Sequence, residues 1–264
     1  MDLTWLRFAE LLCLGVIDGG AGSLTDIGGG LIITPVLTLG FGVPIHQAIA
    51  TSLCCVIATS SGAAASYIEQ RLSDIRLGMT LELATTVGAI SGSLVAAVLS
   101  RETLAVLFAG LLTYAGSTMV RRSRGAETVK PGGVEPYQIE RLPLGLCGSG
   151  AAGVISGMLG VGGGVIKVPM MYLVMGVPFK VATATSNFMI GVTAAASAFI
   201  YYARGDMRPL ITAPTAVGVF LGAGLGARLL RHTPSRWLIR LFSFIAFYFA
   251  AVMIWKSLHG GFAR

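Results

Sequence analysis

Two glycine triplets, each with a proline five residues after its last glycine, interrupt apolar sequence in the two halves of the chain. Residues 26–35 read DIGGGLIITP, and residues 160–169 read GVGGGVIKVP. Glycine is a poor helix former, and lipid offers no water to an exposed backbone. Irregular backbone survives in a membrane only where it lines a polar cavity or is buried in protein. The repeated triplet therefore limits the folds available to this chain.

The composition places most of the chain in lipid. Hydrophobic residues make up 54 % of the 264 residues and charged residues only 12 %, and the mean hydropathy is +0.78. An average globular domain carries about 25 % charged residues, so one soluble core cannot bury this much apolar surface. The net charge of +7 comes mainly from residues between apolar segments. Such loop charge orients membrane proteins and argues against a nucleic-acid partner.

Ten apolar segments predict an all-α polytopic membrane protein with about five helical segments in each half. A helix needs about 20 residues to cross the hydrocarbon core, and most of the segments are long enough. The two that follow the triplets have about 14 residues, which reach about 21 Å, and are expected to be short broken helices or arms of a re-entrant hairpin. The segments are 5–25, 28–41, 45–68, 76–99, 102–120, 142–160, 162–176, 179–203, 208–231 and 235–258.

A polar stretch at 121–141, RRSRGAETVKPGGVEPYQIER, divides an N-terminal transmembrane repeat (1–120) from a C-terminal one (142–264). Its prolines, glycines and five basic residues are typical of a linker outside the membrane. Basic loops favour the cytoplasm, and the predicted topology places eleven basic residues on that side against six outside. We therefore expect a multi-pass protein of a bacterial-type inner (plasma) membrane, with a cytoplasmic linker and both termini outside.

The two halves are copies of one another. A shift of 134 residues aligns 28–52 with 162–186, and 13 of these 25 positions are identical. Each half has five segments, of which five or three cross the membrane, depending on whether the segment after the triplet re-enters. Both numbers are odd, so the second copy is turned upside down relative to the first. The sequence thus predicts two inverted-topology repeats, an architecture found in many secondary transporters.

The triplets predict an anion site. The first N–H groups of a helix have no intrahelical acceptor, and together with the helix dipole they attract negative charge. Glycine lets a ligand approach the backbone closely, and two inverted copies are expected to point at one anion near the middle of the membrane. The candidate substrate-binding glycines are Gly28, Gly29, Gly30, Gly162, Gly163 and Gly164.

Close helix packing is the alternative role for these glycines. It is favoured for Gly88 and Gly92 and for Gly218, Gly222 and Gly226, because their four-residue spacing puts them on one helix face. Packing explains three adjacent glycines less well, since one small residue per turn is enough. A nucleotide-binding loop is disfavoured, because no strand precedes the triplets.

Hydroxyl and amide side chains follow each Gly-Val-Pro turn at matching places. Thr51 and Ser52 occupy these places in the first half, and Thr185, Ser186 and Asn187 in the second. Their side chains are candidate donors to the same anion. Serine and threonine in membrane helices also bond their own backbone, and this alternative stays open.

Lys167 is a charge inside a predicted membrane segment, where the first half has Ile33. Intramembrane charges are expensive and mark functional sites. Lys167 is therefore a candidate partner for a negatively charged substrate. The alternative is that its long side chain snorkels to the interface.

Acidic residues near the first triplet are candidates for ion coupling. Asp26 abuts the triplet, where the second half has Gly160. An acid beside an anion site repels the anion unless it is protonated, paired with Lys167 or bound to a cation, so Asp26 is a candidate proton or sodium site. Asp18 is a second candidate. Glu82 is a weaker one that can simply lie near a loop, and His46 at a helix start can titrate.

No catalytic or metal-binding constellation is present in the sequence. It has no pair of intramembrane acids at hydrolase spacing, no His/Glu cluster, and no nucleophile beside a base. The cysteines form no CxxC and are read as packing residues; they are Cys13, Cys54, Cys55 and Cys147. We expect neither an enzyme nor a bound cofactor or metal.

The doubled pattern of glycine triplet, proline, Gly-Val-Pro and Ala-x-Ala-Thr-Ser (48–52 and 182–186) resembles the sulfite exporter TauE/SafE family of membrane permeases. The resemblance covers nearly the whole chain outside the linker. It implies a secondary carrier that exports or takes up small sulfur-containing anions such as sulfite, sulfonates or sulfoacetate. The first half departs from the family pattern at Asp26, where glycine usually precedes the triplet.

The sequence as a whole favours an ion-coupled secondary transporter of small sulfur-containing anions that works by alternating access. The alternative is an anion channel, or a carrier for another small anion such as thiosulfate or a carboxylate. The expected partners are the small anionic substrate, H⁺ or Na⁺ as coupling ion, and the lipid bilayer. The sequence leaves the oligomeric state open.

Overall fold

A computed structural model describes residues 5–25, 30–69, 73–124, 137–229 and 235–259, and these ranges form helices and turns without a strand. Asp26, Gly28 and Gly29 lie outside the described residues. The elements are α1 (Trp5–Thr25), α2 (Ile33–Pro35), the π-helical turn η1 (Val36–Gly40), α3 (Ile45–Glu69), α4 (Ile75–Val98), α5 (Arg101–Arg124), α6 (Leu142–Leu159), α7 (Gly164–Leu173), α8 (Phe179–Ala203), α9 (Pro209–Leu229) and α10 (Ser235–Leu258).

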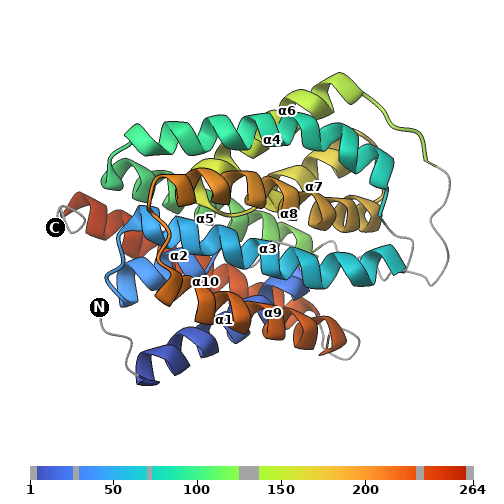
Figure 1. Ribbon diagram of the computed structural model, residues 1–264. Helices are drawn as coiled ribbons and strands as arrows, with labels where there is room; N and C mark the ends of the chain where they lie inside the picture. Colours follow the sequence, from blue (N-terminus) through green and yellow to red (C-terminus); the bar gives the residue numbers. More distant parts are fainter. Residues whose placement is uncertain (1–4, 26–29, 70–72, 125–136, 230–234, 260–264) are drawn as a thin grey trace.

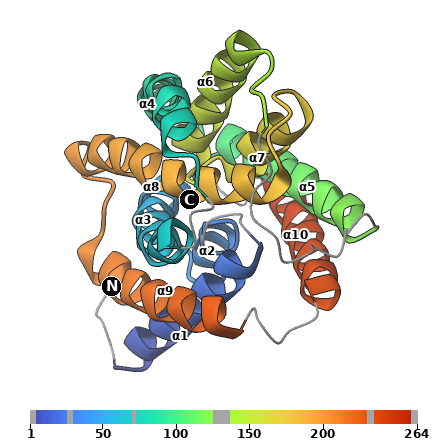
Figure 2. The ribbon, with the colours of Figure 1, turned by 90° about the vertical axis from the view of Figure 1, so that its right-hand side faces the viewer.

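Helices α3 and α8 lie side by side near the centre of the molecule, and the other long helices surround them in pairs. In Figure 2, α4 and α6 form one pair, α1 and α9 a second, and α5 and α10 a third. The pairing exchanges elements between the halves: α1 packs on α9, and its repeat counterpart α6 packs on α4. Each half therefore depends on the other for its packing partners.

Corresponding helices of the two halves run in opposite directions. In Figure 1, α1 begins at the left-hand end of the view and α6 at the right-hand end. Helix α3 runs from left to right, and its counterpart α8 runs back from right to left. An inverted repeat predicts this arrangement. The two-fold relation of the halves across a membrane remains a prediction.

Glycines allow the α4/α6 and α1/α9 pairs to pack backbone against backbone. A Cβ atom at Gly92 would lie 2.1 Å from the carbonyl oxygen of Val154, and one at Gly222 would lie 2.2 Å from that of Val16. Gly88 and Gly218 meet carbonyl oxygens of the opposing helix in the same way. The packing role predicted for these four glycines is thus confirmed, whereas the surroundings of Gly226 lie outside the described side chains.

The apolar character of the long helices fits a membrane environment. Among the described residues, three helical stretches are long and apolar enough to cross a bilayer: 75–98, 142–159 and 181–203. Shorter apolar stretches cover 164–173, 209–225 and 243–258. Large hydrophobic side chains point outward along the bundle, including Leu83 at 75 % and Val98 at 85 % exposure. The prediction of an all-α membrane protein is confirmed.

Short helical elements follow both triplets, as predicted. Helix α7 has 10 residues, which span about 15 Å, half of the roughly 30 Å hydrocarbon core. In the first half, α2 and η1 together cover only residues 33–40. Neither element can cross a membrane. Each therefore has at least one end inside the protein, and the backbone groups of that end need polar partners.

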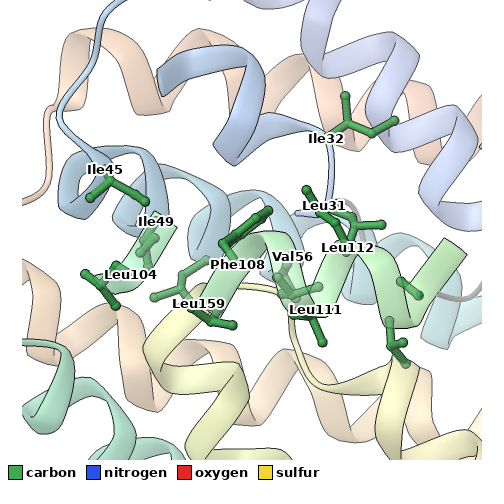
Figure 3. Packing of buried hydrophobic residues seen from close by; sticks show 14 of the residues in the cluster. Leu31, Ile32, Ile45, Ile49, Val56, Leu104, Phe108, Leu111, Leu112 and Leu159 are labelled. Carbon is green, nitrogen blue, oxygen red and sulfur yellow. The ribbon is translucent and has the colours of Figure 1, made fainter. Parts of the chain in front are cut away.

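Apolar side chains fill the space around the two breaks. The largest hydrophobic cluster joins Leu31 after the first triplet with Val56 of α3, Leu112 of α5 and Leu159 at the end of α6. Figure 3 shows these side chains gathered between the chain segments that carry the breaks. The polar backbone at the breaks therefore lies in apolar surroundings, where its hydrogen-bonding groups interact strongly.

Candidate functional site

The two glycine breaks meet at Ser52. The hydroxyl of this α3 residue can donate to the carbonyl oxygen of Gly30 at 3.1 Å and to that of Gly160 at 2.7 Å. A Cβ atom on Gly30 would lie 2.6 Å from Gly160 O, so the two backbones are in contact. The structure thus brings the ends of both triplet segments to one place in the interior.

The second break requires glycine for its backbone conformation. Gly160, Gly162 and Gly163 all have positive φ angles, between 72° and 77°, a region that costs other residues about 1–2 kcal/mol. Gly160 ends α6, and Gly163 is the N-cap of α7 and accepts hydrogen bonds from Ile166 N and Lys167 N. The glycines therefore turn the chain sharply and start α7 with its N-terminus inside the protein.

Lys167 is fully buried beside this break. A Cβ atom on Gly163 would lie 3.5 Å from Lys167 Cε, so the side chain passes along the start of its own helix. Its ammonium donates to Thr193 Oγ1 of α8 at 2.9 Å and lies 3.6 Å from Glu82 Oε2 of α4. With 0 % exposure and these interior partners, Lys167 does not snorkel to the interface, and that alternative is wrong.

Glu82 is the residue that sequence reasoning underrated. The sequence allows Glu82 to lie near a loop. In the structure its side chain faces the interior from α4 with 7 % exposure. Its Oε1 atom accepts hydrogen bonds from Thr193 at 2.6 Å and Thr86 at 3.2 Å. Two features of the sequence could have indicated its role. Glu82 is an acid within an apolar segment, and Lys167, a base within another apolar segment, needs an opposite charge.

The paired threonines contact the starts of two other helices. Thr185 Oγ1 accepts from the backbone N–H of Asp74, the N-cap of α4, at 2.9 Å. Thr51 Oγ1 lies 3.0 Å from Thr212 Oγ1 near the start of α9. Because α4 and α9 are repeat counterparts, each threonine contacts the start of a corresponding helix, although Thr185 bonds a backbone N–H and Thr51 a side-chain hydroxyl. Both threonines are fully buried, and they tie the central helices to the peripheral pairs.

Two buried hydroxyls, one beside the second break and one on α8, have no hydrogen-bond partner among the described residues. Ser186, the counterpart of Ser52, is 1 % exposed, and Ser156 is fully buried on the last turns of α6. Ser156 Cβ is 3.3 Å from the position of a Cβ on Gly163. Asn187 is also buried, with its side-chain amide directed at Thr183 O. Ser156 was not predicted, because its counterpart Gly22 carries no hydroxyl.

Asp18 belongs to the first break. It is 2 % exposed on α1, and its carboxylate accepts a hydrogen bond from the backbone N–H of Ile32 at the entry to α2. Its Oδ2 atom has no hydrogen-bond partner among the described residues. An acid therefore occupies the start of the short helix in the first half. The neighbouring candidates Asp26, Gly28 and Gly29 lie outside the described residues.

Other titratable candidates lie away from this centre or do not cluster. His46 Nε2 is 3.1 Å from Ala96 O near the end of α4. Within the described ranges, no group of three His, Cys, Asp or Glu residues is arranged to hold a metal ion. All four cysteines are free thiols. The candidate site therefore consists of backbone, hydroxyls, Lys167 and two buried acids.

Comparison with known proteins places this geometry in a family. The model of the sulfite exporter TauE/SafE family matches residues 11–253. A probable membrane transporter protein of Xylella fastidiosa (strain 9a5c) is 30 % identical over 255 residues, which cover 92 % of this chain and 93 % of that protein. The probable membrane transporter protein YunE of Bacillus subtilis (strain 168) is 24 % identical over 271 residues, covering 96 % and 99 %.

A third relative matches a shorter part of the chain. The probable membrane transporter protein MJ0441 of Methanocaldococcus jannaschii is 29 % identical over 189 residues, covering 69 % of this chain and 68 % of that protein. No solved structure matches the chain with significance. The family model spans nearly the whole sequence, both breaks included. The chain therefore belongs to the sulfite exporter TauE/SafE family of membrane transporter proteins.

Proposed function

We propose that this membrane transporter is a secondary carrier of small sulfur oxyanions that works by alternating access around the two glycine breaks. One observation carries the proposal: both breaks meet at Ser52 inside the bundle, with the buried cation Lys167 beside the second. Helix starts, hydroxyls and a cation at one interior point form a binding site for a compact anion.

The second break supplies the anion-binding groups. The N–H groups in the first turn of α7 point away from their own helix, and the positive end of the helix dipole lies there. The unpartnered hydroxyls of Ser156 and Ser186 supply further donors, and Lys167 supplies the charge. Sulfite, organosulfonates and sulfoacetate present several oxygens on one sulfur and match such a set of donors. The family assignment supports this choice over thiosulfate or a carboxylate.

The first break supplies the groups that bind the coupling ion. Asp18 holds a carboxylate oxygen in the interior without a hydrogen-bond partner among the described residues, and such an oxygen binds a proton or Na⁺. Asp26 adjoins the same triplet in sequence and is proposed to share this role. Separate sites for cation and anion on the two halves couple the movements of the two ions.

The membrane orientation follows from the distribution of charge. We propose that the basic segment 121–141 lies in the cytoplasm and that both termini lie outside an inner (plasma) membrane, because basic loops favour the cytoplasmic side. Reporter fusions after Arg124 and after Leu258 test this. Reporters that are active on the same side of the membrane would contradict the orientation.

Flux measurements test the proposed function. The purified protein in proteoliposomes is expected to accumulate labelled sulfite or sulfoacetate when a proton or sodium gradient is imposed. Gly163→Leu is expected to abolish flux, since a side chain at φ 77° distorts the start of α7. Gly110→Leu is the matched control, because a Cβ there meets nothing within 4 Å.

Two outcomes would overturn the proposal. Absence of flux for every sulfur oxyanion tested removes the substrate class. Flux that runs only down the gradient of the anion, with no response to H⁺ or Na⁺ gradients, identifies an anion channel instead.

A further inference from the structure

The buried ion pair beside the second break joins Glu82 of the first half to Lys167 of the second, and it has no counterpart beside the first break. Glu82 Oε2 lies 3.6 Å from Lys167 Nζ, in the junction between α4, α7 and α8. The 134-residue repeat places Ala216 and Ile33 at the corresponding positions, and both belong to one hydrophobic cluster. The scaffold thus accepts apolar residues at this junction, and folding alone does not require the charges.

Burying such a pair is expensive. Removal of two charges from water costs several kcal/mol per ion, and the mutual attraction of the ions often fails to offset this cost. The third member of the cluster, Thr193, has the counterpart Thr59, whose hydroxyl bonds its own helix at Cys55 O. A threonine hydroxyl is therefore present at both junctions, and only the charges are specific to the junction beside the second break.

The two oxygens of Glu82 differ in their surroundings. Oε1 accepts hydrogen bonds from Thr193 and Thr86. Oε2 has no hydrogen-bond donor among the described residues, because 3.6 Å to the ammonium exceeds a hydrogen-bond distance. Lys167 in turn uses one of its three N–H donors, on Thr193. An acceptor and a cation thus face each other without a direct hydrogen bond.

We propose that Glu82 competes with the transported anion for Lys167, and that Glu82 Oε2 takes up one proton for each monovalent anion that binds. This inference rests on the proposed function and adds a second proton-binding group, beside the second break and separate from Asp18 and Asp26, as well as the charge of the substrate. When an anion oxygen takes the place of Glu82 at Lys167 Nζ, the carboxylate loses its counterion. A new O–H bond on Oε2 then converts it to a neutral acid.

The charge balance selects the substrate. The empty site holds Lys167⁺ and Glu82⁻, with no net charge. The loaded site holds Lys167⁺, a neutral Glu82 and one monovalent anion, and again has no net charge. A divalent anion would leave one negative charge in a site of low dielectric, where it costs far more than in water. The site therefore favours hydrogen sulfite and sulfonates with a single charge over dianions, which include sulfate, the sulfite dianion and sulfoacetate.

Other titratable groups on the surrounding helices lie outside this contact. Helix α6 carries Cys147, which is exposed, and α7 carries Tyr172, which is 48 % exposed. Helix α8 carries Tyr201, whose hydroxyl bonds Gly157 O and Met158 O. Within the described residues, Lys167 is the charged side chain that faces Glu82.

Calorimetry on the purified full chain in detergent tests the proposal. Methanesulfonate, which stays monovalent over the working pH range, is titrated into the protein in two buffers with different ionisation enthalpies. We expect uptake of about one proton per anion. We also expect the affinity to fall about tenfold for each unit by which the pH rises, in the range where Glu82 is ionised. Sulfate is expected to bind more weakly.

Glu82→Gln removes the proton site. Glu102→Gln, at an exposed position of α5, is the matched control. Glu82→Gln is expected to bind methanesulfonate without proton uptake and without pH dependence, whereas Glu102→Gln behaves like the wild type. Methanesulfonate binding to the wild type without proton uptake would overturn the inference and leave the proposed function standing. If neither methanesulfonate nor sulfite binds, the proposed function fails, and the inference fails with it.

A measurement on the wild type alone covers the case in which Glu82→Gln does not fold. Infrared difference spectra recorded on addition of methanesulfonate are expected to show the band of a newly protonated carboxyl group. A spectrum without this band would overturn the inference. A purely structural ion pair would produce neither the band nor the proton uptake.

Discussion

The two glycine breaks share a sequence pattern and meet at one point, but they carry opposite chemistry. Beside the first break, the acid Asp18 accepts the N–H of Ile32 at the entry to α2. Beside the second, the base Lys167 lies within α7. Each half also lacks the other's charge, since Ile33 corresponds to Lys167 and Ala152 to Asp18. A duplicated scaffold thus presents an acidic and a basic environment at one centre.

This difference separates the packing contacts that both halves share from the charges that differ between them. The repeat builds the contacts that hold the bundle, and these occur twice: Thr51 and Thr185 each bond the start of a peripheral helix. The charges occur once. Duplication therefore accounts for the scaffold, and divergence of a few interior positions supplies a site for two ions of opposite sign.

The largest expected effect comes from removal of the base. Lys167→Met leaves Glu82 buried without its partner, and breaking a buried pair in this way costs about 3–5 kcal/mol. The double change Lys167→Ile and Glu82→Ala copies the residues at the corresponding junction, Ile33 and Ala216, and it is expected to restore most of the stability without restoring anion binding. Unfolding midpoints and methanesulfonate titrations of both variants measure these effects.

Additive effects of Lys167→Ile and Glu82→Ala would contradict this prediction, because residues in contact couple energetically. Retained anion affinity in Lys167→Met would remove the base from the binding site. Either result would make the two breaks more alike than their sequences indicate.

The second largest effect concerns why each break needs glycine. Gly163 has a left-handed backbone, whereas Gly30 lies against backbone, since a Cβ there would be 2.6 Å from Gly160 O. Alanine is expected to cost about 1–2 kcal/mol at Gly163 from strain, and about 1–3 kcal/mol at Gly30 from overpacking. Asparagine, which adopts the left-handed region more readily, should be the milder change at Gly163 and the harsher one at Gly30.

Thermal unfolding of the four variants in detergent measures this order. If alanine and asparagine rank the same way at both positions, the glycines serve one purpose. The two breaks would then differ in their charges alone.

Local sequence was enough to predict the scaffold. The triplets marked where helices end, because three adjacent glycines oppose helix formation in any context. The four-residue spacing of Gly88 and Gly92 marked a packing face, since residues four apart lie on one side of a helix. These features depend on neighbours along the chain and need no knowledge of the fold.

The arrangement of charges required the fold. Nothing near Glu82 in sequence indicates Lys167, because the two residues meet only after α4 packs beside α7 and α8. For the same reason, the sequence alone could not exclude a Lys167 side chain that snorkels to the interface. The hydroxyl contacts also required the fold, since Ser52 bonds the carbonyl oxygens of Gly30 and Gly160, which lie in different halves of the chain.

A smaller effect is expected at the acid of the first break. Asp18→Asn keeps an oxygen that accepts the N–H of Ile32 but abolishes the negative charge. Accumulation driven by a proton or sodium gradient should be lost, while exchange of anion across the membrane continues and stability changes little. Counterflow and gradient-driven uptake in the same proteoliposomes separate the two. Unchanged coupling would remove Asp18 from the mechanism and leave the cation role to Asp26 and Glu82.

The smallest effects compare the two equivalent serines. Ser52→Ala removes hydrogen bonds to the carbonyls of Gly30 and Gly160 and should cost about 1–2 kcal/mol of stability. Ser186→Ala removes a hydroxyl without a partner among the described residues, so stability should hold or rise. If Ser186 donates to the anion, the loss of one such bond lowers affinity about tenfold. A drop in stability without a change in affinity would make both serines structural, and anion recognition would then rest on backbone and Lys167.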